Sequence, residues 1–151
     1  LAESCTGGLI ASKVTSVAGS SQVFEAGIVS YSNEIKHSVL GVSKDTLKKE
    51  GAVSESVVLE MAKGVLALSG SDYAIAVSGV AGPGGGTKEK PVGTCWIAWG
   101  TKDALKAKCL FIPVGREQFQ QFISSAALDL IRRDILGVED APLYFSKNNR
   151  K

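Results

Sequence analysis

Serine hydroxyls and one lysine amine are the groups in this sequence that we consider first for catalysis. His37 is the only histidine, and its polar neighbours indicate a solvated side chain. A lysine can replace histidine as the base when burial or neighbouring cations lower its pKa. Lys36 is the candidate base, with Ser4, Ser21 or Ser78 as the hydroxyl that it would activate. Spacing alone does not choose among the three serines.

A glycine-dense loop, residues 78–86, follows the apolar run 73–77. Its glycines allow positive φ angles and let backbone N–H groups approach an anion or a carbonyl group. The loop is not a P-loop, because Lys88 is followed by Glu89, and it lacks the last glycine of a dinucleotide fingerprint. Ser78 also lacks the flanking glycines of a nucleophile elbow. A surface hairpin loop is the alternative interpretation.

A second candidate for anion binding is the segment 4–8, Ser-Cys-Thr-Gly-Gly, which leads into a predicted helix over residues 9–14. Free N–H groups and the positive end of the helix dipole would favour a phosphate there. A helix cap with a tight turn explains the same residues equally well. Further along, Tyr31 and Lys36 are five positions apart, so this is not the Tyr-x-x-x-Lys pair of short-chain dehydrogenases. That spacing counts against an oxidoreductase.

Strand and helix patterns alternate along the chain. Apolar runs predict strands, and helical spacing between serine caps and glycine ends predicts helices. The predicted strands cover residues 24–31, 73–77, 91–99 and 106–112, and the predicted helices cover 9–14, 34–40, 43–51, 54–70 and 116–136. This alternation predicts a three-layer α/β domain whose central sheet is covered on both faces. We place the domain over residues 1–137 and a polar, solvated tail over 138–151.

Composition narrows the class of protein. The chain has 151 residues, 44% of them hydrophobic, and fits one domain with a single core. A net charge of +2 argues against direct nucleic-acid binding, and no apolar run approaches the ~20 residues of a membrane helix. Three well-separated cysteines favour a reducing cytoplasm over a disulfide framework. Because Leu1 opens a strand-like run, we expect a native amino-terminal helix and part of a strand to be missing.

Six ordered motifs together resemble the CinA carboxy-terminal domain family. They are Ala-Glu-Ser-Cys-Thr-Gly-Gly at 2–8, Gly-Ser-Ser at 19–21, Tyr-Ser-Asn-Glu-x-Lys at 31–36, Gly-Ala-Val-Ser at 51–54, Ser-Gly-Val-Ala-Gly-Pro-x-Gly-Gly at 78–86 and Glu-Lys-Pro-Val-Gly-Thr at 89–94. The resemblance extends from Leu1 to Gly137. Characterised members of this family are nicotinamide mononucleotide amidases.

The resemblance implies a fold, a reaction and a set of partners. The fold is a three-layer α/β/α sandwich with a central mixed sheet. The reaction hydrolyses the carboxamide of nicotinamide mononucleotide to nicotinate mononucleotide and ammonia, in pyridine-nucleotide recycling. The substrate is then a small nucleotide, no metal or organic cofactor is needed, and the protein is expected to be a cytoplasmic homo-oligomer that contacts neither nucleic acid nor membrane.

The resemblance also assigns roles by position. It makes Ser21 the nucleophile, Lys36 its base and Tyr31 a hydrogen-bonding assistant, and it places Ser78 and Arg116 in the active site. The expected substrate-binding positions are Ser4, Thr6, Gly7, Gly8, Asn33, Gly79 and Gly82. We expect the substrate phosphate at residues 4–8, with Arg116 as a second anion ligand. A non-catalytic nucleotide-binding or competence- and DNA-damage-associated protein is the alternative, because a preserved fold can serve as a binding module.

Overall fold

The centre of the sheet is built from apolar runs that are buried on both faces. The computed structural model describes residues 1–146. Its strands are β1 (Ala2–Glu3), β2 (Ile28–Val29), β3 (Tyr73–Gly79), β4 (Thr94–Thr101) and β5 (Ala104–Phe111). Residues 74–78 of β3 are all buried, as the continuous apolar pattern of this run predicts for a central strand. The strand order is β2-β1-β3-β4-β5.

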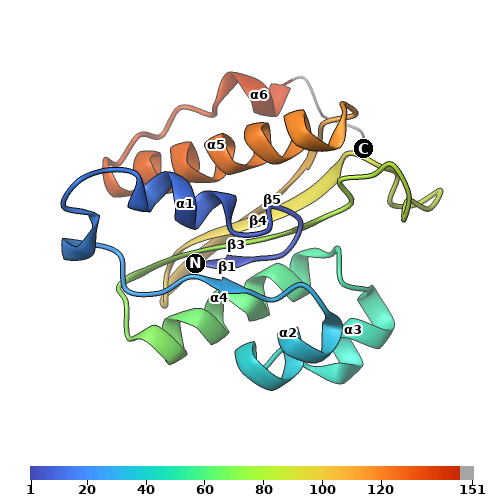
Figure 1. Ribbon diagram of the computed structural model, residues 1–151, viewed down its shortest axis with the longest axis horizontal. Helices are drawn as coiled ribbons and strands as arrows, with labels where there is room; N and C mark the ends of the chain where they lie inside the picture. The colour runs from blue at the N-terminus through green and yellow to red at the C-terminus, as the bar shows by residue number, and fades with distance from the viewer. Residues whose placement is uncertain (147–151) are drawn as a thin grey trace.

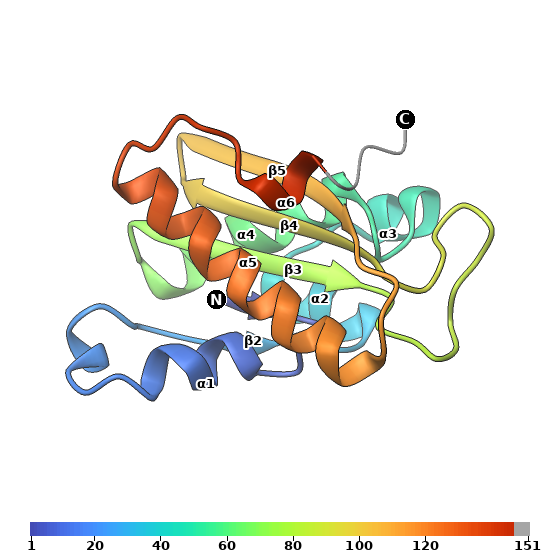
Figure 2. The ribbon, with the colours of Figure 1, turned by 90° about the horizontal axis from the view of Figure 1, so that it is seen from above.

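Helices cover both faces of this sheet, so the predicted three-layer arrangement is confirmed (Figure 1). The helical segments are α1 (Leu9–Thr15), the 3₁₀ turn η1 (Ser20–Gln22), α2 (Asn33–Leu40), α3 (Lys44–Glu50), α4 (Glu55–Ser69), α5 (Arg116–Ile135) and α6 (Leu143–Ser146). α1, α5 and α6 lie on one face, and α2, α3 and α4 lie on the other (Figure 1). In the view turned by 90°, α5 crosses above the strands (Figure 2).

Two hydrophobic clusters hold the layers to the sheet. On the α1 and α5 side, Val77 packs with Ile10 and Phe119, and on the α4 side Ala76 packs with Met61. Val77 and Ala76 are consecutive in β3, and their side chains enter opposite layers because successive strand residues face opposite sides. The sheet therefore has a core on each face rather than on one.

Glycine at position 64 allows α2 and α4 to pack closely. A Cβ atom on Gly64 would lie 1.9 Å from the carbonyl oxygen of Leu40, the last residue of α2. No side chain fits at that distance without moving the helices apart. This close contact fixes α2, the helix that carries Lys36, against the α4 layer.

The sheet is mixed, and its parallel part sets the position of the candidate site. β1 pairs in parallel with β2 and with β3, whereas β4 runs antiparallel to both β3 and β5. The chain leaves β1 through α1 on one face and reaches β3 through α2, α3 and α4 on the other. Ligand sites in such folds lie at the carboxyl ends of the strands where the direction of winding reverses. Here those ends are Glu3, Val29 and Gly79.

Two predicted segments differ clearly from the structure. The strand predicted over residues 24–31 is only two residues long, Ile28–Val29, because β1, its only partner, pairs over just two residues. Part of the predicted polar tail is also structured: α6 packs on α5, where the Tyr144 ring meets Phe122 edge-on and its hydroxyl donates to Asp129. The apolar side chains of this segment explain the difference. The basic residues predicted to end the tail, 147–151, lie outside the described residues.

Candidate active site

Lys36 lies in the interior of the protein, one turn into α2. The Ser32 side chain caps this helix by accepting a hydrogen bond from the Ile35 N–H, and Gly41 ends it. The sequence leaves Ser32 and Asn33 open as the cap and predicts the terminal glycine. Only 1% of Lys36 is exposed. Its Nζ lies 3.0 Å from Ser4 Oγ and 2.6 Å from the Ser30 carbonyl oxygen, with the Tyr31 carbonyl oxygen at 3.5 Å.

The surroundings of Lys36 favour the neutral amine. None of the ion pairs found among residues 1–146 involves Lys36. Burial lowers the pKa of Lys36, and the charge that the Cys5 thiol can carry opposes part of that change by raising it. A neutral amine has two hydrogens and one lone pair. The carbonyl oxygens of Ser30 and Tyr31 can accept the hydrogens, which leaves the lone pair for the Ser4 hydroxyl.

Ser4 is the hydroxyl that the structure places beside Lys36. It directly follows β1, and its N–H donates to the carbonyl oxygen of Val77 in β3 at 3.1 Å. Ser4 is buried, at 9% exposure, so the Ser4–Lys36 contact is shielded from bulk water. A buried lysine in hydrogen-bond contact with a serine hydroxyl is the arrangement in which lysine can act as the base for a serine nucleophile.

The structure does not bring Ser21 into hydrogen-bond contact with Lys36. Ser21 is exposed in η1, which follows the end of α1, whereas Ser4 precedes the start of α1. The physical reason is the strand direction: η1 precedes β2, whereas Lys36 follows it, so the two lie at opposite ends of the parallel strands. Sequence spacing could not reveal this separation. Whether Ser21 takes part in the reaction stays a prediction.

At the expected phosphate site, residues 4–8, a carboxylate of the protein already occupies the start of α1. Glu3 is 1% exposed and accepts hydrogen bonds from the N–H groups of Gly8, Ile10 and Ala11 at 2.7–3.1 Å. The Thr6 hydroxyl donates to the same carboxylate at 2.6 Å. A buried negative charge there repels a phosphate and uses the N–H groups that would bind it.

Arg116 joins two of the predicted site segments. It opens α5, and its guanidinium donates to the Gly82 carbonyl oxygen at 2.9 Å and to the Tyr31 hydroxyl at 3.0 Å. The Tyr31 ring thus bonds to Arg116, whereas only the carbonyl oxygen of Tyr31 contacts Lys36. This geometry therefore does not support a direct role for the Tyr31 hydroxyl between Lys36 and its serine. Arg116 and Tyr31 instead form a polar rim.

The remaining predicted positions lie near the ends of β3 and α2. Ser78, which is 1% exposed, donates its hydroxyl to the Ala52 carbonyl oxygen at 2.8 Å and so ties β3 to the turn before α4. Gly79 ends β3, where a Cβ atom would lie 2.7 Å from the Thr94 carbonyl oxygen. Asn33 is exposed at the start of α2. Catalytic or binding roles for these three residues stay predictions.

Three contributors to the site were not predicted from the sequence. Glu3 holds the turn after Ser4, Ser30 supplies a carbonyl oxygen to Lys36, and Gln120 of α5 donates to the Cys5 carbonyl oxygen at 2.8 Å. A charged residue inside an apolar strand, directly before Ser-x-Thr-Gly-Gly, was the available signal for Glu3. The other two contacts come from tertiary packing.

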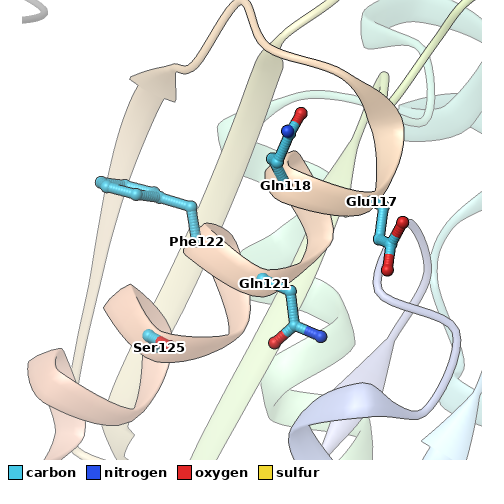
Figure 3. Close-up of a pocket in the computed structure, with 5 residues that line it drawn as sticks. All are labelled: Glu117, Gln118, Gln121, Phe122 and Ser125. Atoms are coloured by element: carbon cyan, nitrogen blue, oxygen red, sulfur yellow. The ribbon is translucent and has the colours of Figure 1, made fainter.

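A pocket on α5 lies outside this site. Glu117, Gln118, Gln121, Phe122 and Ser125 line it, and Figure 3 shows their side chains spreading from the surface of one helix. Neither Ser4 nor Lys36 contributes to its wall. Among residues 1–146, no side-chain hydrogen bond joins its polar groups to a buried amine or hydroxyl. We therefore assign the chemistry to the carboxyl end of the parallel strands.

The fold and this site together define an α/β/α protein with a buried serine–lysine pair. The chain belongs to the CinA C-terminal domain family, whose profile matches residues 1–135. This agrees with the resemblance seen in the motifs. In the part of the chain that the structure describes, no helix has the length and apolar character needed to cross a membrane.

Individual relatives differ in length. The chain is 61% identical over 149 residues to the nicotinamide-nucleotide amidohydrolase PncC of Enterobacter agglomerans, covering 97% of this chain and 84% of that protein. It is 54% identical over 146 residues to a CinA-like protein of Colwellia psychrerythraea, covering 97% of this chain and 34% of that protein. The chain thus spans about a third of the length of such CinA-like relatives.

Solved structures show the same fold. The competence damage-inducible protein A (ComA) from Klebsiella pneumoniae is similar with a TM-score of 0.87 at 38% identity, over 91% of this chain and 86% of that one. The competence/damage inducible protein CihA from Agrobacterium tumefaciens is similar with a TM-score of 0.84 at 42% identity, over 87% of this chain and 81% of that one.

Proposed function

We propose that this chain is a nicotinamide-nucleotide amidohydrolase that converts nicotinamide mononucleotide to nicotinate mononucleotide and ammonia. The observation that carries the chemistry is the 3.0 Å contact between Lys36 Nζ and Ser4 Oγ, made by a lysine that is 1% exposed. The observation that supports the substrate is the 61% identity to a nicotinamide-nucleotide amidohydrolase over 97% of this chain.

In this proposal Ser4 is the nucleophile and Lys36 is the base. Neutral Lys36 takes the Ser4 hydroxyl proton while Ser4 Oγ bonds to the carboxamide carbon. The protonated lysine then returns this proton to the amide nitrogen, so that the C–N bond breaks and ammonia leaves. Water next gives a proton to Lys36 and attacks the acyl-enzyme, and the return of that proton to Ser4 Oγ releases the carboxylic acid, which loses its proton to solvent to give nicotinate mononucleotide. No step needs a metal or an organic cofactor.

Arg116 is the strongest candidate to bind the substrate phosphate. Because Glu3 occupies the start of α1, the phosphate needs another cation or N–H cluster. Arg116 lies on the rim beside Tyr31 and Gly82, and a guanidinium can bind a phosphate through two parallel hydrogen bonds. Phosphate binding at Arg116 would place the pyridine carboxamide toward Ser4, with the glycine-rich loop as one wall.

Ammonia release from nicotinamide mononucleotide tests this function. We expect turnover by the unaltered protein, loss with Ser4→Ala and with Lys36→Ala, and turnover with Ser21→Ala. Loss of turnover in Ser21→Ala, with Ser4→Ala still active, would exclude Ser4 as the nucleophile but keep the reaction. Nucleotide binding without ammonia release, over a range of pH, would instead favour the non-catalytic alternative. A cytoplasmic location and a homo-oligomeric state also stay predictions.

A further inference from the structure

The turn after Ser4 leaves two backbone N–H groups without an acceptor. Of the eight residues from Ser4 to Ala11, six donate their N–H: Ser4 to Val77, Gly7 to Ser4, Leu9 to Thr6, and Gly8, Ile10 and Ala11 to the Glu3 carboxylate. The N–H groups of Cys5 and Thr6 have no acceptor among the described residues. Both residues are buried, at 4% and 3% exposure.

N–H groups without partners in buried residues are rare in folded proteins, and each is explained by a bound ligand, an ordered water or strain. These two directly follow Ser4 in the chain. In α/β-hydrolases the N–H of the residue after the nucleophile binds the oxyanion, because it lies beside the carbonyl carbon under attack. The free N–H groups of Cys5 and Thr6 are therefore the backbone donors that we consider for the negative charge formed during attack by Ser4 Oγ.

We propose that the N–H groups of Cys5 and Thr6 bind the carboxamide oxygen of the substrate, and that Glu3 is the positioning residue that orients them. This inference rests on the proposed amidohydrolase function. In the tetrahedral intermediate the carbonyl oxygen carries the negative charge, and the two N–H groups stabilise it. Glu3 acts from behind the turn and does not touch the substrate.

Glu3 is suited to this role because its carboxylate fixes the turn from both sides. It accepts the Thr6 hydroxyl within the turn and the N–H groups of Gly8, Ile10 and Ala11 beyond it. These bonds use the N–H groups at the start of α1, so that α1 cannot shift relative to β1. Hydrogen bonds to a charged acceptor are stronger than neutral ones, which makes the turn rigid.

Thr6 gives the sharpest test, because its hydroxyl can be removed at constant shape. Thr6→Val loses the 2.6 Å bond to Glu3, whereas Thr6→Ser keeps a hydroxyl there. Thr15→Val is the matched control, because the Thr15 hydroxyl bonds only to carbonyl oxygens within α1. Glu3→Gln is the second variant. It keeps the shape of the side chain but removes the charge.

Each protein is assayed with nicotinamide mononucleotide and with its thioamide analogue, whose sulfur accepts hydrogen bonds poorly. We expect Thr6→Val and Glu3→Gln to lower kcat for the amide by about 10-fold to 100-fold, with KM nearly unchanged. The loss with the thioamide should be much smaller, and Thr6→Ser should restore most of the amide rate. Thr15→Val should match the unaltered protein on both substrates.

Equal losses on the amide and the thioamide, or a change confined to KM, would overturn the assignment of the two N–H groups while leaving the amidohydrolase function intact. Failure of the unaltered protein to release ammonia from the amide would overturn the proposed function itself. Should Glu3→Gln fail to fold, the comparison of Thr6→Val with Thr6→Ser still decides the question, because both keep the carboxylate.

Discussion

The Lys36 amine lies nearer to the Ser30 carbonyl oxygen, at 2.6 Å, than to the Ser4 hydroxyl, at 3.0 Å. Ser30 directly follows β2 and Ser4 directly follows β1, so the ends of two adjacent parallel strands hold the amine between them. The Ser30 carbonyl oxygen can only accept a hydrogen bond, whereas the Ser4 hydroxyl can also donate one. This difference orients the lone pair of a neutral Lys36 toward Ser4.

Replacing Lys36 by arginine should abolish activity although the positive charge remains. A guanidinium stays protonated at any accessible pH and cannot take the Ser4 proton. We expect kcat to fall by about 10²-fold to 10⁴-fold, the usual contribution of a general base. Steady-state ammonia release measures this loss. Lys13→Arg, the same substitution at a lysine of α1, is the control, and it should leave kcat unchanged.

The rate should rise with pH because the neutral amine is the active form. Burial lowers the pKa of Lys36, so the midpoint of the rise in kcat/KM should lie below the ordinary lysine range. Between the lowered pKa of Lys36 in the folded protein and the ordinary lysine pKa, the unfolded chain binds more protons than the folded one. The free energy of unfolding should therefore also rise with pH in this range. A pH profile that is flat from neutral to alkaline would contradict the lysine base.

Removing the Arg116 guanidinium should affect the nucleotide and the nucleoside differently. If this group binds phosphate, Arg116→Ala should raise KM for nicotinamide mononucleotide by about 10-fold or more, as expected for loss of a charged hydrogen-bond donor. Turnover of nicotinamide riboside, which has no phosphate, should change little. An equal loss on both substrates would indicate that Arg116 only holds Tyr31 and Gly82 in place.

Alanine at Gly64 should destabilise the protein through the contact between α2 and α4. The added Cβ atom would lie 1.9 Å from the Leu40 carbonyl oxygen, and we expect a loss of about 1–3 kcal/mol in the free energy of unfolding. Urea unfolding measures it. Gly84→Ala is the control, because nothing lies within 4 Å of its Cβ position and its φ angle is not positive, so it should change stability by less than about 0.5 kcal/mol.

Local signals in the sequence predicted the layers and the helix that carries Lys36. Apolar runs, serine caps and terminal glycines are short-range features, and they placed α2 between Ser32 and Gly41 correctly. The partner of Lys36 depended instead on the parallel register of β1 and β2, which brings Ser4 and Ser30 together and leaves Ser21 at the other end. That register is a tertiary property, so three serines remained equivalent in the sequence.

The role of Glu3 shows a different limit. Serine, threonine and two glycines before a helix predict an anion site whether the anion is a substrate phosphate or a carboxylate of the chain. We expected a substrate phosphate or a plain cap at this motif, and the structure shows that a carboxylate of the chain accepts the N–H groups there.

Ser4 and Lys36 belong to different layers of the sandwich. Ser4 leads into α1 on one face of the sheet, whereas Lys36 belongs to α2 on the other face (Figure 1). The hydroxyl and its base therefore meet only while both helical layers are attached to the sheet. Detachment of either layer, even with the rest of the fold intact, would leave an inert serine or a solvated lysine. The amidase activity of the protein would then depend directly on whether both helical layers are packed on the sheet.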